Sequence, residues 1–98
     1  MSARDAAWFR ASLAEAAPPE SLSVALQGLW WDGRGDWDKA HACAQAQDDA
    51  VGAAVHAYLH RKESDLSNAG YWYRRAGRSM PAGTLDGEWA ALVAELLG

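Results

Sequence analysis

β-Branched residues are scarce in this sequence. Among 98 residues there are four valines, one threonine and no isoleucine, whereas alanine occurs 22 times and leucine ten times. Valine, isoleucine and threonine favour strands, while alanine and leucine favour helices. The composition therefore argues against a sheet and predicts an all-α chain, and the length predicts a single domain over residues 1–98.

Long apolar runs and paired cysteines are also missing. No stretch approaches the ~20 consecutive apolar residues that cross a bilayer, so we expect no membrane anchor. Cys43 is the only cysteine, which excludes an internal disulfide and is typical of a reducing compartment. The first residues contain no apolar segment followed by a small-residue cleavage site. We therefore expect a cytoplasmic protein.

The chain has no excess of positive charge. Nine lysines and arginines stand against 13 acidic residues, which gives a net charge of −4. Nucleic-acid binding needs a basic surface that neutralises phosphates, so the composition argues against that class of partner. Five cations lie between residues 61 and 80: Arg61, Lys62, Arg74, Arg75 and Arg78. This stretch fits a local acidic group better than an extended polyanion.

Short breaks divide the chain into six helix-sized segments. Pro18-Pro19 ends the first, Asp36 can cap the third, Asp48 or Asp49 the fourth, and Thr84 the last. Apolar residues recur at helical spacing in each segment, and in the segment 22–32 they occupy two opposite faces. The pattern predicts about six short antiparallel helices, with the second paired to the third and the fourth to the fifth.

The two central hairpins repeat one pattern. A shift of 29 residues places Gly35-Asp36-Trp37 on Ser64-Asp65-Leu66, and Ala40 on Ala69. Each copy has a tight turn with an aspartate, then a helix with a large apolar residue followed three residues later by alanine. A small alanine at that position lets two helix axes approach closely.

With these residues the chain resembles the tetratricopeptide and Sel1-like helical repeats. The matching residues are Gly28, Trp31, Gly35, Asp36 and Ala40 in the first copy, and Ala57, Asp65, Ala69, Tyr73, Ala76 and Pro81 in the second. The resemblance implies two repeats, roughly 22–47 and 51–81, with capping helices at 3–17 and 84–97. The offset is shorter than the standard ~34 residues, and His60 stands where the repeat has an apolar or aromatic residue.

The resemblance also implies a function. Repeats of this kind bind proteins or peptides in a groove lined by the first helix of each hairpin. The groove positions match Asp32, Tyr58, Arg61 and Lys62, where an acidic group of a partner could meet two cations beside an aromatic ring. An alternative is that the N-terminal helix covers this groove. The resemblance predicts a non-catalytic interaction module, with no cofactor.

A second class of function is a small metal-binding or catalytic protein. His56, His60 and Glu63 are spaced i, i+4 and i+7, so they share one side of a helix as zinc ligands can. Against this, the sequence has no His-Glu-x-x-His motif, and His41 belongs to the other hairpin. His41 and Cys43 point to nearly opposite sides of one helix, which argues against a nucleophile–base pair. We expect neither a metal nor an enzyme.

A third class is a structural subunit that forms a homodimer through aromatic residues. Six tryptophans are many for a short chain. Trp31, Trp37 and Trp89 lie on apolar stripes and are predicted to be core residues, whereas Trp8, Trp30 and Trp72 fall beside them and are candidates for exposed anchors. Covering such residues between two copies would remove an apolar patch, so we expect a homodimer rather than a monomer.

Overall fold

The predicted all-α class is confirmed by a computed structural model, which describes residues 4–98. Within these residues there are six helices and no strand. The helices are α1 (Ala6–Ser12), α2 (Val24–Gly33), α3 (Trp37–Ala46), α4 (Ala50–Lys62), α5 (Leu66–Arg75) and α6 (Leu85–Leu97). None of the helices in the described part combines the length and the apolar character that crossing a bilayer requires.

Each helix begins at a residue whose side-chain oxygen accepts a hydrogen bond from the first turn. Asp49, rather than Asp48, caps α4, and Asp36 and Thr84 cap α3 and α6 as predicted. The remaining caps are Asp5, Ser23 and Asp65. The helix boundaries therefore follow from local chemistry that the sequence displays.

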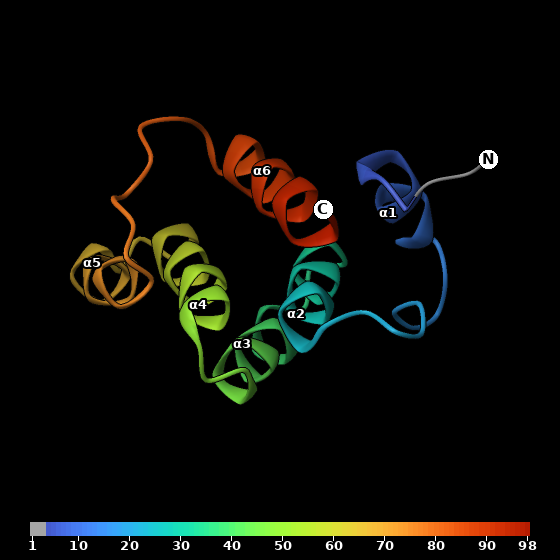
Figure 1. Cartoon of the computed structure of the whole chain (residues 1–98), viewed down its shortest axis with the longest axis horizontal. Helices are drawn as coiled ribbons and strands as arrows, with labels where there is room; N and C mark the ends of the chain where they lie inside the picture. Colours follow the sequence, from blue (N-terminus) through green and yellow to red (C-terminus); the bar gives the residue numbers. More distant parts are fainter. Residues whose placement is uncertain (1–3) are drawn as a thin grey trace.

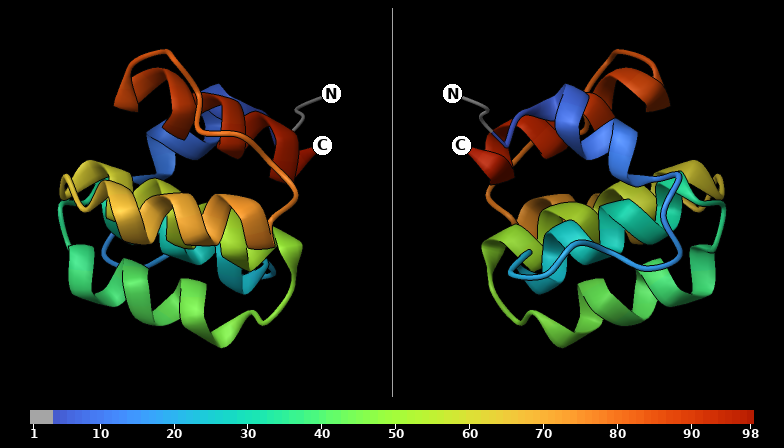
Figure 2. Two further views of the ribbon diagram at one scale, coloured as in Figure 1. Left: turned by 90° about the vertical axis from the view of Figure 1, so that its left-hand side faces the viewer. Right: turned by 90° about the vertical axis from the view of Figure 1, so that its right-hand side faces the viewer.

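Helices α2 to α5 follow one another in an arc, and α6 lies across its open side (Figure 1). The links α2–α3, α3–α4 and α4–α5 are each three residues long, which places successive helices side by side. Helix α6 packs against α2, α4 and α1. In Figure 2, α1 and α6 form one layer on top of the arc.

The turns at the two equivalent positions have the same conformation. Gly35 has φ +83° and Ser64, 29 residues later, has φ +65°. The following aspartate amides also bond equivalent carbonyls, Asp36 to Trp31 and Asp65 to His60, both at 2.9 Å. Ala40 and Ala69 are fully buried, as predicted for close helix pairs. The two turns, 29 residues apart, thus have matching backbone geometry.

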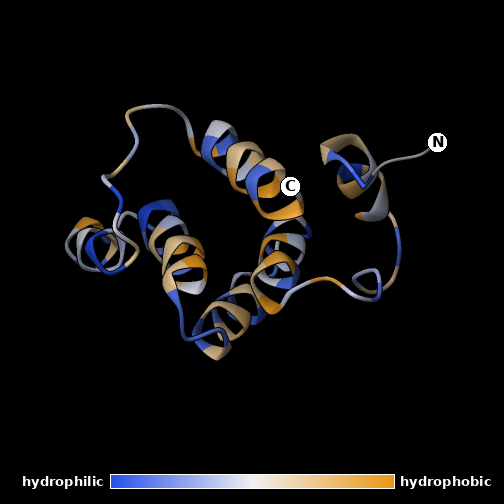
Figure 3. Ribbon diagram, viewed as in Figure 1, coloured by the Kyte–Doolittle hydropathy of each residue, from blue (hydrophilic) through white to orange (hydrophobic). Residues whose placement is uncertain are grey.

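The core is largely built around α4. All nine residues from 52 to 60 are buried, and the body of the helix is apolar while its C-terminal end is hydrophilic (Figure 3). Gly28 of α2 lies so close to α3 that a Cβ atom would come within 3.1 Å of the Ala40 carbonyl oxygen. This contact explains a glycine inside a buried helix.

The structure corrects two expectations about the N-terminal half. Trp30 is fully buried in the hydrophobic core rather than exposed, and its indole Nε1 donates to Ser12 Oγ of α1 at 3.1 Å. The predicted helix 3–17, whose first residue lies outside the described residues, is observed only as Ala6–Ser12, with turns over residues 13–17. Trp89 is buried as predicted, while Trp31 and Trp37 are half-buried at the edge of the core.

The matching turns lead to a reciprocal prediction. A side chain at positive φ costs about 1–2 kcal/mol, and a Cβ atom at Gly35 would touch nothing within 4 Å. Ser64→Gly should therefore raise the free energy of unfolding by about 1 kcal/mol, and Gly35→Ser should lower it by a similar amount. Urea unfolding of both variants measures this, and equal shifts of the same sign would contradict it.

Candidate functional site

Three of the four predicted groove residues meet in one cluster, in which Asp32 and Tyr58 are buried and Lys62 is exposed. The Tyr58 hydroxyl of α4 donates to Asp32 Oδ2 of α2 at 2.7 Å, and Lys62 Nζ lies 2.8 Å from Asp32 Oδ1. Asp32 is buried, so these two donors compensate for its lost hydration. Burial raises the pKa of the Tyr58 phenol above its ordinary value, and the hydrogen bond to Asp32 raises it further. Tyr58 therefore remains protonated and donates.

Arg61, the fourth predicted residue, pairs with α6 instead. Its Nη1 lies 2.8 Å from Glu88 Oε1, and its Nη2 donates to the carbonyl oxygen of Gly83. Tyr73 of α5 donates to the other oxygen of Glu88 at 2.6 Å. Arg61 was predicted to bind an acidic group of a partner. In the structure, Glu88 of the C-terminal helix supplies that group.

Two of the hollows that border α6 also touch the hairpin helices, and each has its own lining. The smaller, of about 200 Å³, includes Asp32, Tyr58 and Lys62 together with Arg10 and Trp89. Three predicted groove residues therefore reach one surface hollow. Lys62 and Asp32 form an ion pair there, so the charge that was expected to attract a partner is partly neutralised within the chain.

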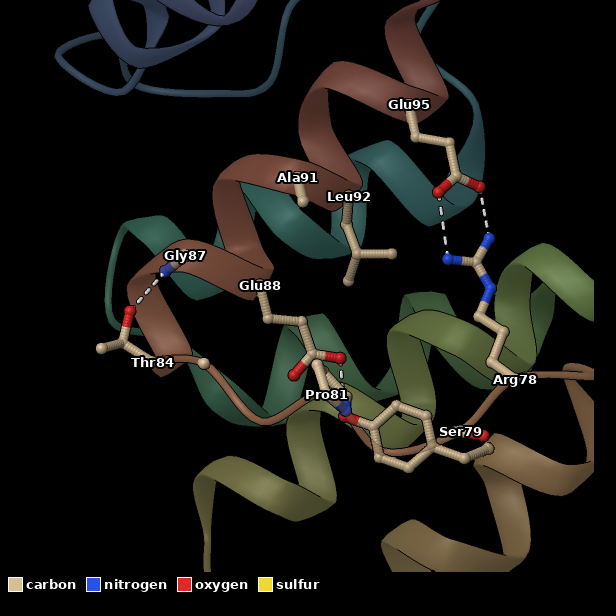
Figure 4. Close-up of a pocket in the computed structure, with 11 residues that line it drawn as sticks. Arg78, Ser79, Pro81, Thr84, Gly87, Glu88, Ala91, Leu92 and Glu95 are labelled. Carbon is tan, nitrogen blue, oxygen red and sulfur yellow. Dashed lines mark hydrogen bonds and ion pairs between the residues drawn. The ribbon is translucent and has the colours of Figure 1, made fainter.

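The larger cavity, of about 360 Å³, lies between α5, the 76–84 linker and α6. Glu88, Ala91 and Leu92 project from the side of α6 that faces it, and Arg78 faces Glu95 at its edge (Figure 4). Arg78 Nη1 lies 3.0 Å from Glu95 Oε1, and Nη2 bonds the other oxygen. The volume of the cavity falls in the range of roughly 300–1,000 Å³ typical of ligand sites. Sequence reasoning missed this cavity because the long linker has no periodic pattern.

The structure also brings the three histidines of the chain together. His41 of α3 and His56 and His60 of α4 have ring centroids 4.5–5.2 Å apart, and one ring nitrogen of each lies within 4.8 Å of the others. Trp37 stacks on His41, and Trp72 of α5 stacks on His56. From the sequence, His41 was assigned to a different hairpin from the other two histidines. The two hairpins pack through α3 and α4, which brings the three rings together.

Hydrogen bonding and burial define the state of these rings. His60 Nδ1 lies 2.6 Å from Glu63 Oε1, and Asn68 Nδ2 lies 3.4 Å from His60 Nε2. Burial lowers the pKa of His56 from 6.5 to about 4, with smaller contributions from His41 and His60. Burial also lowers the pKa of His41. Near neutral pH, His41 and His56 are therefore uncharged and have a free lone pair.

Comparisons with known proteins give no relative for this chain: it matches no family model, no curated protein sequence and no solved structure. The resemblance to tetratricopeptide and Sel1-like repeats therefore depends on the quoted residues and remains a prediction. The candidate sites have to be judged by their geometry alone.

The Asp32 cluster leads to a stability prediction. Tyr58→Phe removes a donor to a buried carboxylate and should lower the free energy of unfolding by about 1.5–3 kcal/mol. In an Asp32→Asn background the same change should cost less, since the charged acceptor is gone. Denaturant unfolding of the double-mutant cycle measures the coupling.

Tyr71→Phe is the matched control for this cycle. Tyr71 is exposed and its hydroxyl accepts only from Arg75, so its removal should change stability by less than about 0.5 kcal/mol. Equal costs for Tyr58→Phe and Tyr71→Phe would show that the bond to Asp32 contributes nothing.

Proposed function

We propose that this chain is a non-catalytic interaction module that binds a segment of a partner protein in the cavity between α5, the 76–84 linker and α6. The observation that carries the proposal is the shape and chemistry of that cavity. Its lining combines apolar groups such as Pro81, Ala91 and Leu92 with a charged edge. A pocket of about 360 Å³ accommodates one or two large apolar side chains of a peptide.

The charged edge supports a ligand with an acidic group. The Arg78 and Glu95 side chains are 34% and 50% exposed, and an ion pair in such a position contributes only ~0–1 kcal/mol. A carboxylate of the ligand can therefore replace Glu95 on Arg78 at little cost. The Arg61–Glu88 pair is far less exposed and is held by Tyr73, so it is part of the scaffold.

The proposed site differs from the groove expected from the sequence, and α6 is the reason. Helix α6 lies across the first helices of both hairpins, α2 and α4. Its Glu88 forms an ion pair with Arg61, so Arg61 is not available to a partner. The linker 76–84 and α6 line the proposed cavity on the α5 side. In this proposal, Arg78 binds the acidic group of the partner, which the sequence had predicted for Arg61 and Lys62.

Selection from a random peptide library on the immobilised full chain tests the function. We expect enriched peptides with a large apolar residue next to an acidic one. Ala91→Trp would fill the cavity and should abolish binding of the selected peptides, measured by isothermal titration calorimetry. Arg78→Ala should weaken it about tenfold, in line with the loss of a charge-assisted contact.

Ala42→Trp provides the control. Ala42 is exposed, and it belongs to α3, which contributes no residue to the lining of this cavity. This variant should bind the selected peptides like the unchanged protein. Failure to enrich any motif, or equal affinity of the Ala91→Trp variant, would refute the proposal.

A further inference from the structure

The histidine cluster has the spacing of a metal site. Three imidazoles bound tetrahedrally to one zinc ion, at about 2.0–2.1 Å, hold their ring centres roughly 5 Å apart. The observed ring centroids of His41, His56 and His60 are 4.5, 4.8 and 5.2 Å apart. Their ligand nitrogens lie within 4.8 Å of one another, compared with roughly 3.3 Å around a bound ion. Small rotations of the rings would close this difference.

The ring nitrogens lack protein partners that would explain the cluster otherwise. Among residues 4–98, the hydrogen bonds of the structure involve no ring nitrogen of His41 or His56. His56 is only 3% exposed as a residue, but within residues 4–98 no side-chain nitrogen or oxygen is both fully buried and unpaired. The ring nitrogens without a protein partner are therefore accessible from solvent, and a cation can reach them.

The groups around the rings match those that support metal ligands. A metal-binding histidine usually donates its second ring N–H to a carboxylate, which fixes the tautomer. Glu63 accepts in this way from His60 Nδ1, and this bond leaves the lone pair of His60 on Nε2. Asn68 makes only a weak 3.4 Å contact with Nε2, which a metal ion can displace. Trp37 and Trp72 stack on the faces of the His41 and His56 rings.

We propose that His41, His56 and His60 bind one divalent transition-metal ion of the zinc class, with the fourth position open to water on the side of half-exposed His41. Imidazole ligands select zinc, copper and nickel over magnesium and calcium. The site extends over both hairpins, because α3 supplies one ligand and α4 the other two.

Titration of the chelator-treated full chain, prepared without a polyhistidine tag, tests the site. Zinc chloride should bind with one-to-one stoichiometry by isothermal titration calorimetry and raise the melting temperature. Cobalt(II) chloride should give the intense visible absorption of a tetrahedral ion. Magnesium chloride should do neither. Absence of zinc binding at 100-fold molar excess would overturn the proposal.

His41→Gln is the decisive variant, because His41 is only half-buried and its replacement leaves the α4 core intact. We expect at least tenfold weaker zinc binding and loss of the cobalt spectrum. Ala42→Gln introduces the same residue at an exposed position of the same helix and should keep both. Circular dichroism checks that both variants are folded. Unchanged zinc affinity in folded His41→Gln would overturn the assignment to these three residues.

Discussion

The burial of helix α4 among its neighbours depends on contacts that its polar side chains make with the surrounding groups. Tyr58 donates to Asp32 of α2, and His60 is held between Glu63 and Asn68. His56 makes ring contacts with His41 and Trp72, from the helices on either side. Leaving the Tyr58 hydroxyl unpaired in the interior would cost about 1–3 kcal/mol. The arc of α2 to α5 is thus tied together by polar contacts as well as by apolar packing.

The position of α6 depends on the same helix. Arg61, the residue directly after the buried stretch, pairs with Glu88, and Tyr73 of α5 bonds the same carboxylate. One acidic side chain of α6 is therefore fixed by two hairpin helices at once. Such largely buried charges add little net stability, but they penalise every arrangement that separates them. This constraint places α6 across the arc and creates the cavity beside it.

The sequence was a good guide to local structure. Caps such as Asp36 and Thr84 and the small residues Ala40 and Ala69 act where the pattern predicted, since each depends on a few neighbouring residues. It was a poor guide to contacts between distant segments. Buried Trp30 bonds Ser12 of another helix, and Arg61 pairs with Glu88, 27 residues away.

The candidate sites show the same limit. Asp32, Tyr58 and Lys62 were predicted for one groove, and in the structure these three side chains lie in contact and bond one another. The repeat also implied that α3 contacts α4, yet the sequence pattern alone gave no measure of how close His41 comes to His56. Ring separations of about 5 Å are a property of the packed helices and had to be read from the structure.

Native-state hydrogen exchange tests most directly whether the whole structure depends on α4. The amides of residues 55–60 should exchange only through global unfolding, with an opening free energy equal to the free energy of unfolding measured by urea. Those of the short helix α1 should exchange through local opening at a lower free energy. Opening of residues 55–60 well below the global free energy of unfolding would contradict the account.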